Sequence, residues 1–261
     1  MRRLATAVLV AAGAGLALGP AGSGAAGPGE PRAGASVIPY GPRVQVMVVG
    51  RTRLWKAATF VYSRPFTALV AGRRCAVVGG TPLATLEAAR RLAGPSFHLR
   101  DFGACSLRPA ESSGLFVDRV GFDYNRGRDG WVYKVDRRAG TASAGGLAGP
   151  FGTGRRLRAG QRVTWFYCRL GFGGCQRTLD LYVPVRRPAA GSQLAVHVHS
   201  YDDLARGHSA AGATVSLAGA RAVTDAGGNA TLPVPATSGP QRVYAGQPGL
   251  VPAFPVDVFV P

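Results

Sequence analysis

Thr81-Pro-Leu-Ala-Thr-Leu-Glu-Ala-Ala-Arg-Arg-Leu92 predicts the one clear helix of this sequence, and the expected fold is built around it. Thr81 is a good N-cap, and Pro82 suits the first helical position, where its missing N–H is not needed. Gly94-Pro95 ends the helix. We expect a single apolar face, formed by Leu83, Leu86, Ala89 or Arg90, and Leu92.

Short apolar or β-branched runs surround this helix and predict strands at residues 44–49, 59–62, 68–70 and 75–78. Residues 161–167 alternate, with Val163, Trp165 and Tyr167 on one side and Arg162, Thr164 and Phe166 on the other. Trp131, Tyr133 and Val135 repeat the pattern. One helix among about five strands is typical of a mixed sheet that wraps the helix.

The sequence from residue 193 onward predicts strands alone. Alternating apolar residues open it at Leu194, Val196 and Val198 and close it at Phe254, Val256, Val258 and Val260. Short runs between them are separated by turn residues, as in a small sandwich. The chain also contains 38 Gly and 19 Pro, which favours short strands and turns over a helical bundle. We therefore expect a mainly β protein, an α+β domain with one helix followed by a β-sandwich.

The expected organisation begins with a signal peptide at residues 1–26. Arg2 and Arg3 precede an apolar run, residues 4–18, that is shorter than the roughly 20 residues needed to span a bilayer, and cleavage is expected after Ala25 or Ala26. A Gly- and Pro-rich flexible linker follows at residues 27–42. The two domains are expected at residues 43–185 and 192–261, separated where Pro and small residues interrupt the strand pattern. We expect a secreted or cell-envelope protein.

The four cysteines, Cys75, Cys105, Cys168 and Cys175, form an even set, which in an exported chain predicts disulfides. Three pairings are possible. Cys168 and Cys175 flank a Gly-rich turn, so a bond between them would close a short hairpin and leave Cys75 for Cys105. Their spacing does not fit a zinc site, which needs ligands closer together.

Four stretches in order carry a resemblance: Thr81-Pro-Leu-Ala-Thr-Leu-Glu-Ala-Ala-Arg90, Gly114-Leu-Phe-Val-Asp-Arg-Val-Gly121, Gly130-Trp-Val-Tyr-Lys-Val135 and Ala159-Gly-Gln-Arg-Val-Thr-Trp-Phe-Tyr167. Together they resemble the transcobalamin-like C-terminal domain family of unknown function, over residues 60–183. The resemblance implies a β-grasp fold and, at most, a binding or adhesion module. This chain has no room for the helical domain against which the vitamin carriers close over a corrin, so cobalamin binding is not implied.

The family pattern places Asn-Gly after the last valine of the third stretch, where this sequence has Asp136-Arg137. The sequence therefore does not predict a tight hairpin there. In the second domain, Thr224-Asp-Ala-Gly-Gly-Asn-Ala-Thr-Leu232 resembles the carboxypeptidase regulatory-like, immunoglobulin-type sandwich. That resemblance implies a spacer or display module.

The charge balance, 31 basic against 13 acidic residues, raises the question of an anionic partner. The basic residues are nearly all arginines in scattered pairs, and the densest cluster is Arg155, Arg156 and Arg158. This scatter favours a compositional bias over nucleic-acid binding. An acidic cell-envelope polymer would fit an exported protein better and is the alternative partner to an unidentified small ligand.

Candidate site residues are few, and no catalytic residue, metal or cofactor is predicted. Trp131, Tyr133, Trp165 and Tyr167 are candidates for lining a ligand groove, although residues at strand spacing are more often core. His197 and His199, with Asp202, Asp203 and His208 nearby, are the alternative, a metal site of an enzyme; their alternation with apolar residues places them at solvent positions instead. Asp123-Tyr-Asn-Arg-Gly-Arg-Asp129 is interpreted as a polar hairpin turn and not as a calcium loop.

Overall fold

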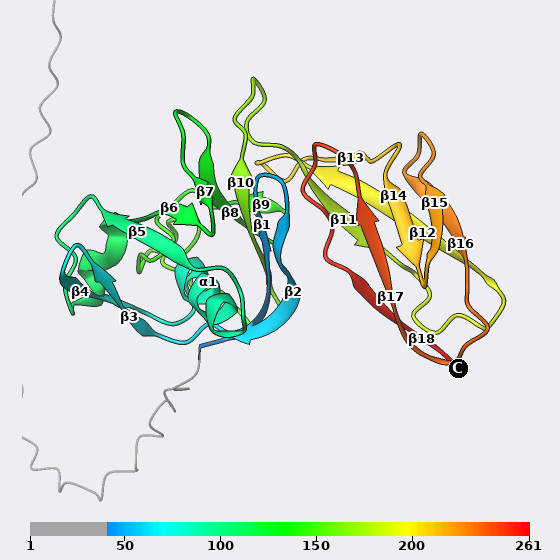
Figure 1. Ribbon diagram of the computed structural model, residues 1–261, viewed down its shortest axis with the longest axis horizontal. Coiled ribbons are helices and arrows are strands. Elements are labelled where there is room, and N and C mark those ends of the chain that lie inside the picture. Colours follow the sequence, from blue (N-terminus) through cyan, green and yellow to red (C-terminus); the bar gives the residue numbers. More distant parts are fainter. Residues whose placement is uncertain (1–40) are drawn as a thin grey trace, which may run out of the picture. The chain divides into compact units, whose positions relative to one another are not determined.

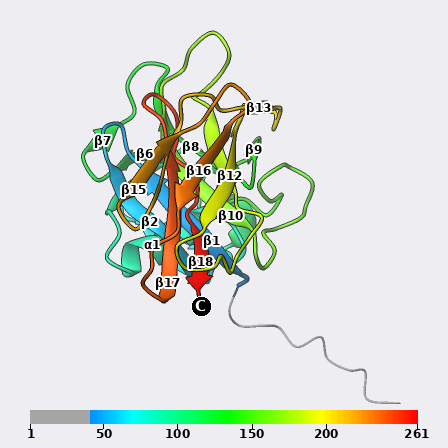
Figure 2. The same cartoon turned by 90° about the vertical axis from the view of Figure 1, so that its right-hand side faces the viewer.

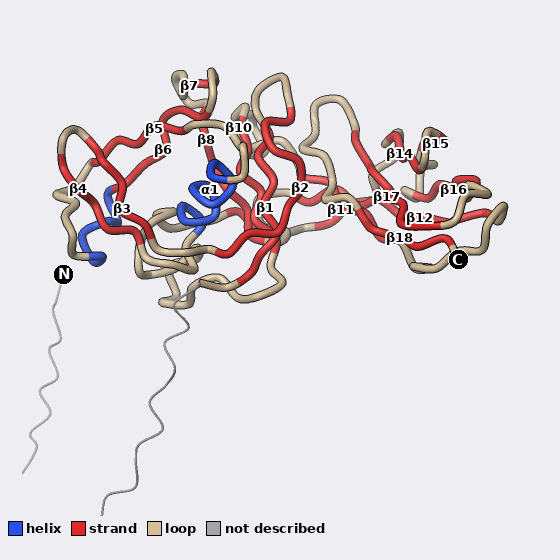
Figure 3. The backbone as a smooth tube through the Cα atoms, turned by 60° about the horizontal axis from the view of Figure 1, so that its bottom comes forward, coloured by secondary structure: helices blue, strands red, loops and turns tan. Residues whose placement is uncertain are grey.

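The computed structural model describes residues 41–261 (Figure 1), so the expected signal peptide and nearly all of the expected linker lie outside the described residues. The described residues all belong to one compact unit. The chain is mainly β, as the composition predicts, and Figure 3 shows how little of the tube is helical. Within this described part, no helix has the length and apolar character that a membrane crossing requires.

A five-stranded mixed sheet forms the centre of the first region. Its order is β2-β1-β10-β8-β9, with bounds β1 (Arg43–Val49), β2 (Leu54–Tyr62), β8 (Gly130–Val135), β9 (Arg138–Ala139) and β10 (Arg162–Cys168). The central strands β1 and β10 are parallel, and an antiparallel neighbour flanks each of them. With helix α1 (Pro82–Arg91) across one face, this is the β-grasp arrangement expected from the sequence.

Helix α1 begins and ends where the sequence predicts. The Thr81 hydroxyl accepts a hydrogen bond from the Ala84 N–H at 3.3 Å, Pro82 is the first helical residue, and Leu92 is the C-cap. The apolar face differs from the expectation, because Ala84, Thr85 and Glu87 are buried as well and Leu92 is exposed. A second contact adds to the burial at the helix start: the Leu83 N–H donates to the Ala144 carbonyl, so the segment after β9 packs against the first turn of α1.

Two smaller sheets complete the first region. They are the hairpin of β3 (Phe66–Val70) with β4 (Arg73–Val77), and a three-stranded sheet of β5 (Phe97–Asp101), β6 (Leu115–Val120) and β7 (Asp123–Tyr124); the short 3-10 helix η1 (Pro109–Gly114) precedes β6. The Cys75–Cys105 disulfide joins β4 to the connection after β5. Cys168 and Cys175 form the second disulfide, so the pairing favoured by the spacing is confirmed.

The second region is a β-sandwich of two four-stranded sheets, which face the viewer in Figure 2. One sheet contains β11 (Thr178–Tyr182), β12 (Gln193–Tyr201), β13 (Gly207–Ser209) and β16 (Asn229–Pro233); the other contains β14 (Thr214–Leu217), β15 (Ala220–Val223), β17 (Gly239–Gly246) and β18 (Val256–Val260). Leucines, valines and alanines fill the space between them, which confirms the alternation seen at both ends of this part of the sequence.

Strand pairing places the start of this sandwich earlier than the sequence indicates. β11 precedes the expected boundary at residues 186–191, yet it pairs antiparallel with β12 along its whole length. The Pro- and Arg-rich stretch between them is therefore a connection inside the sandwich. Proline signals a break in a strand pattern, but it does not distinguish a turn within a domain from a linker between domains.

The hairpin at Asp136-Arg137 is tight, contrary to the expectation from its departure from Asn-Gly. Val135 pairs with Arg138, so two residues make the turn, and Asp136 has a φ of 55°. An aspartate tolerates this left-handed conformation better than most residues do. The Asp136 carboxylate also accepts hydrogen bonds from the Arg162 N–H and the Gln161 amide, which fix the turn against β10.

Both faces of β10 are buried, whereas its alternation predicts one buried face. Val163, Trp165 and Tyr167 belong to the core beneath α1. On the opposite face, Phe166 packs with Met47, Val251 and Phe254, the last two from the connection between β17 and β18. The sandwich thus covers the side of β10 that would otherwise face water.

Candidate functional site

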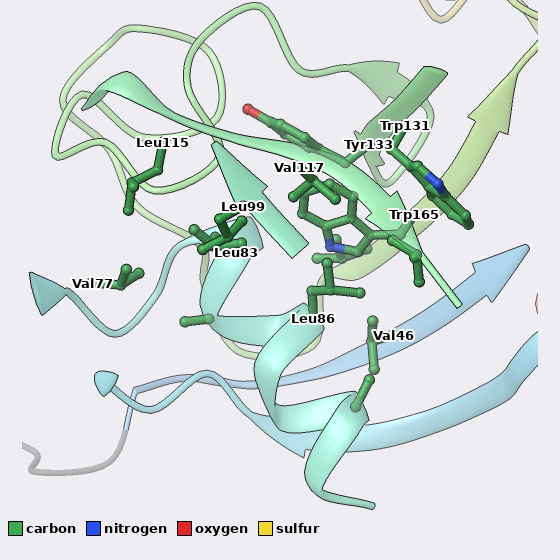
Figure 4. Close-up of a cluster of buried hydrophobic side chains, with 14 of the residues drawn as sticks. Val46, Val77, Leu83, Leu86, Leu99, Leu115, Val117, Trp131, Tyr133 and Trp165 are labelled. Atoms are coloured by element: carbon green, nitrogen blue, oxygen red, sulfur yellow. The ribbon is translucent and has the colours of Figure 1, made fainter. Parts of the chain in front are cut away.

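The four aromatic residues singled out in the sequence lie together on two paired strands. Tyr133 of β8 is directly opposite Trp165 of β10, and Trp131 is opposite Tyr167. The ring centroids of these two pairs are 5.3 and 6.0 Å apart. All four residues are buried, with at most 6% of any of them exposed, and Figure 4 shows Trp165 between Leu86 and Val117. The structure therefore places them in the core of the first region, and their part in ligand binding stays a prediction.

The polar atom of each ring is bonded to a main-chain carbonyl. The Tyr133 hydroxyl donates to Ala142 at 2.7 Å, and the Tyr167 hydroxyl donates to Tyr124 at 3.0 Å. The indole N–H groups do the same: Trp131 donates to Asp123 at 2.8 Å and Trp165 to Pro82 at 3.2 Å. A buried indole or phenol needs such a partner, and here the partners belong to strand β7, the start of α1 and the loop after β9. The four rings thereby fix these three segments to the sheet.

A cavity of about 220 Å³ lies beside these rings. Trp131, Tyr133 and Trp165 line one side of it, and Leu115, Phe116 and Val117 of β6 line another. The segment after β9 closes it with Gly140, Ala142, Ser143 and Ala144. The wall is mainly apolar, so the cavity suits an apolar group.

Ser143 is one of the residues that line this cavity, and its side chain carries an unsatisfied polar atom. The hydroxyl oxygen of Ser143 is buried and has no hydrogen-bond partner among the described residues. A buried hydroxyl without a partner costs roughly 1 to 3 kcal/mol. Ser143 is not among the residues predicted from the sequence, because a serine in a Gly-rich stretch has no distinguishing pattern and its burial depends on the fold of residues 140–157.

Gly140 fixes the approach of this segment to the sheet. A Cβ atom at this position would lie 2.1 Å from carbon atoms of the Tyr133 ring, which leaves space for no side chain. Burial raises the pKa of the Tyr133 hydroxyl far above its ordinary value, so the group stays protonated. Tyr133 can therefore donate a hydrogen bond but cannot serve as a base near neutral pH.

The two histidines of β12 form a half-buried pair. Their ring centroids are 4.1 Å apart, and Nδ1 of His197 lies 2.8 Å from the Asn229 side-chain oxygen. The pKa of His199 is lowered, first by burial and then by the positive charges of His197 and Arg137. Over residues 41–261, no group of three or more His, Cys, Asp or Glu side chains is arranged to hold a metal ion. The alternation predicts that both rings face solvent, and in the structure they do so only in part, because both are half-buried.

The acidic residues near these histidines have other partners. Asp202 accepts hydrogen bonds from the main-chain N–H groups of Leu204 and Arg206. Asp203 lies 3.3 Å from the ammonium of Lys134, which is completely buried and also donates to the Tyr201 and Asp202 carbonyls. Burial lowers the pKa of Lys134, and the neighbouring aspartates only partly oppose that effect. Lys134 thus joins β8 to the end of β12.

The oxygen side chains of residues 123–129 also bind protein groups. The Asp123 carboxylate accepts the Arg51 N–H and the Trp55 indole N–H, at 3.0 and 2.9 Å. The Asp129 carboxylate accepts the Leu170 N–H at 2.9 Å. These contacts agree with the interpretation of this stretch as a polar turn, and they hold three loops together.

Comparisons with known proteins give little to place beside this geometry. No family model and no curated protein matches the chain, so the resemblance to the transcobalamin-like family stays a prediction. Among solved structures, the chain is similar to the D0-D1 domain of intimin, with 14% identity, a TM-score of 0.27, and coverage of 85% of this chain and 99% of that one. A likeness this low says nothing about function.

Proposed function

We propose that this protein is an exported, non-catalytic binding module that holds a small apolar ligand with one hydrogen-bonding group. The observation that carries the proposal is a mainly apolar cavity whose lining includes Ser143, a residue with a buried and unpartnered hydroxyl. Export is supported by the two disulfides, which persist in oxidising compartments.

The chemistry of the wall selects the ligand class. Rings of Trp131 and Trp165 offer flat apolar surface, and Ser143 offers a hydroxyl that both donates and accepts. A ligand group that bonds to this hydroxyl would remove the cost of its burial. The volume, about 220 Å³, is below the range of roughly 300 to 1,000 Å³ typical of drug-sized ligands, so a corrin is too large and a single or fused ring fits.

The proposal of binding without catalysis rests on the same residues. The four aromatic polar atoms are occupied by carbonyls, and Tyr133 stays protonated. Ser143 has no base within hydrogen-bond reach in the described chain, whereas a nucleophilic serine needs one. The cavity therefore offers shape and one polar contact.

The test uses pairs of small probes that differ in one polar group: phenol and benzene, p-cresol and toluene, indole and indene. Titration calorimetry on the purified chain should give tighter binding for the polar member of at least one pair. Ser143→Ala should weaken the binding of that polar probe by about tenfold, since it removes one hydrogen bond of about 1.4 kcal/mol. The affinity for the apolar analogue should stay unchanged.

Two further variants make the result decisive. Ser113→Ala changes an exposed serine of η1 outside the cavity and should leave all affinities unchanged. Ala142→Leu fills the cavity and should abolish binding of every probe. If no probe binds, or if Ala142→Leu binds as tightly as the native chain, the proposal is wrong.

A further inference from the structure

Four connections of the first region end at one edge of the molecule. We define the loop end as residues 50–53 between β1 and β2, 121–122 between β6 and β7, 125–129 between β7 and β8, and 169–175 after β10. Cys168 pairs with Gly130, so the end of β10 and the start of β8 lie side by side. Figure 1 shows the turns beyond these two strands projecting in the same direction.

Short hydrogen bonds hold these loops in fixed positions. Asp123 joins the turn of Arg51 to β7, and Asp129 joins its own turn to Leu170. Two of the tips are tight turns closed by reciprocal main-chain bonds, one between Arg126 and Asp129 and one between Gly171 and Gly174. The Cys168–Cys175 disulfide closes the base of the last loop. The loop end is therefore preorganised.

Large apolar side chains occupy the tips of this loop end. Phe172, between Gly171 and Gly173, is fully exposed, and Phe122 is 79% exposed. The Phe122 ring lies 5.7 Å from the half-buried ring of Trp55, and Leu170 is exposed beside the Phe172 turn. Phe172 and Phe122 have the largest exposed fractions among the large apolar side chains of the described residues, and apolar side chains exposed together are typical of a docking surface.

The same loop end is basic. Arg51, Arg53, Arg126, Arg128 and Arg169 are all exposed there, and none of them forms an ion pair with any residue of the described chain. Asp129 of the loop end and the adjoining Asp123 of β7 are half-buried, and their carboxylates accept main-chain N–H groups. The outward charge is therefore positive.

We propose that the loop end docks on the surface of an anionic lipid bilayer, with Phe172 and Phe122 entering the boundary between headgroups and acyl chains. Exposed arginines attract anionic headgroups, and aromatic rings at the tips of rigid turns gain from partial insertion. A soluble anionic polymer would use the arginines and leave both phenylalanines in water. The apolar tips therefore favour a lipid surface over a polymer, and this surface does not depend on the ligand cavity.

Sedimentation of the purified chain with vesicles tests the proposal. Vesicles of equimolar phosphatidylglycerol and phosphatidylcholine should bind it, and vesicles of phosphatidylcholine alone should bind it at least tenfold more weakly. Phe172→Ala combined with Phe122→Ala should weaken binding to the anionic vesicles by about tenfold or more. Phe102→Ala is the matched control, because Phe102 is 76% exposed but follows the far end of β5.

A second pair of variants tests whether binding depends on the arginines of the loop end or only on the net positive charge of the protein. Arg126→Gln with Arg128→Gln should weaken binding about tenfold and reduce its salt dependence. Arg155→Gln with Arg158→Gln removes the same charge from the densest arginine cluster of the sequence and should change binding far less. Thermal unfolding confirms that each variant is folded.

A direct readout of depth completes the test. Phe172→Trp should show a blue-shifted tryptophan emission with anionic vesicles and quenching by lipids brominated on their acyl chains. The proposal is overturned if Phe172 and Phe122 can be replaced without loss of vesicle binding. It is also overturned if a soluble poly(glycerol phosphate) displaces the chain completely from the vesicles, and does so equally well for the native chain and for the variant without both rings. Absence of binding to both kinds of vesicle also overturns the proposal.

Discussion

The cores of the two regions are built from different residues. Between the sheets of the sandwich, the buried apolar residues are leucines, valines and alanines. The core beneath α1 also contains Trp131, Tyr133, Trp165 and Tyr167, whose polar atoms all bond to main-chain carbonyls of β7, the start of α1 or the loop after β9. Most connections between the sandwich strands are short. In the first region, residues 140–161 form one long connection without a strand. The aromatic residues of the first region therefore supply side-chain donors that tie separate elements to the central sheet, and the aliphatic side chains between the sandwich sheets offer no such donors.

The largest expected effect comes from removing one of these rings. Trp165→Ala should lower the free energy of unfolding by about 3 to 5 kcal/mol, because it empties a buried volume and frees the Pro82 carbonyl. It should also increase amide exchange along residues 140–157. Leu232→Ala in the sandwich should cost about 2 to 5 kcal/mol without that increase. Denaturant unfolding and hydrogen exchange measure both quantities, and equal exchange in the two variants would contradict the comparison.

The disulfides distinguish the regions next, since no cysteine lies within the sandwich strands. Cys75→Ser with Cys105→Ser should cost about 3 to 4 kcal/mol, because the bond closes a loop with a sequence separation of 30. Cys168→Ser with Cys175→Ser should cost only about 2 kcal/mol, since its separation is 7. Unfolding with and without reductant checks the order, and a larger loss from the second pair would reverse it.

Lys134 tests the joint between the regions. Lys134→Met removes a cation that donates to the Tyr201 and Asp202 carbonyls and faces Asp203, and it should cost about 2 kcal/mol. Burial lowers the pKa of Lys134, so the unfolded chain binds more protons above that lowered pKa. Native stability should therefore rise with pH up to about 10.4, and the variant should lose this rise. An unchanged pH profile in Lys134→Met would show that the group does not titrate in this way.

A single hydroxyl gives a smaller effect. Tyr133→Phe leaves the ring in place and removes its hydrogen bonds to Ala142 and Pro150, which should cost about 1 kcal/mol. Tyr182→Phe, at an exposed position of the sandwich, is the control and should cost nothing measurable. Because burial raises the pKa of Tyr133, ultraviolet titration of the native protein should also show a tyrosine that ionises only on unfolding, and Tyr133→Phe should have one fewer tyrosine of this kind than the native protein.

The smallest effect concerns helix α1. Burial alone would raise the pKa of Glu87, but hydrogen bonds from Arg90 and Arg91 outweigh it and hold the pKa below its ordinary value. The stability from this group is therefore present above the unfolded pKa and is lost as the pH falls through the folded one. Glu87→Gln should remove about 0.5 kcal/mol of this acid dependence. Urea midpoints between pH 3 and pH 6 measure this acid dependence. Glu111→Gln is the control, because Glu111 forms an exposed ion pair with Arg108 outside α1.

The sequence by itself determined the features that depend on near neighbours. Thr81, Pro82 and Gly94 set the ends of α1 because capping acts within one turn, and the spacing of Cys168 and Cys175 favoured their pairing. Alternation located the strands that contain the four aromatic residues, since side chains of a strand change face at each residue. The order of these strands around one helix then predicted the mixed sheet.

The tertiary structure alone decided which surfaces are covered. Phe166 and Lys134 are buried because the sandwich lies against that face of β8 and β10, and no pattern within either strand reports a contact with residues 201–254. The position of β11 was decided by pairing across a proline-rich connection. The Ser143 hydroxyl and the loop end are likewise assembled from segments far apart in the chain. The burial and the charge of such places depend on residues that are distant in the sequence. The local sequence fixes only the backbone conformation and the face of the strand or helix on which each side chain lies.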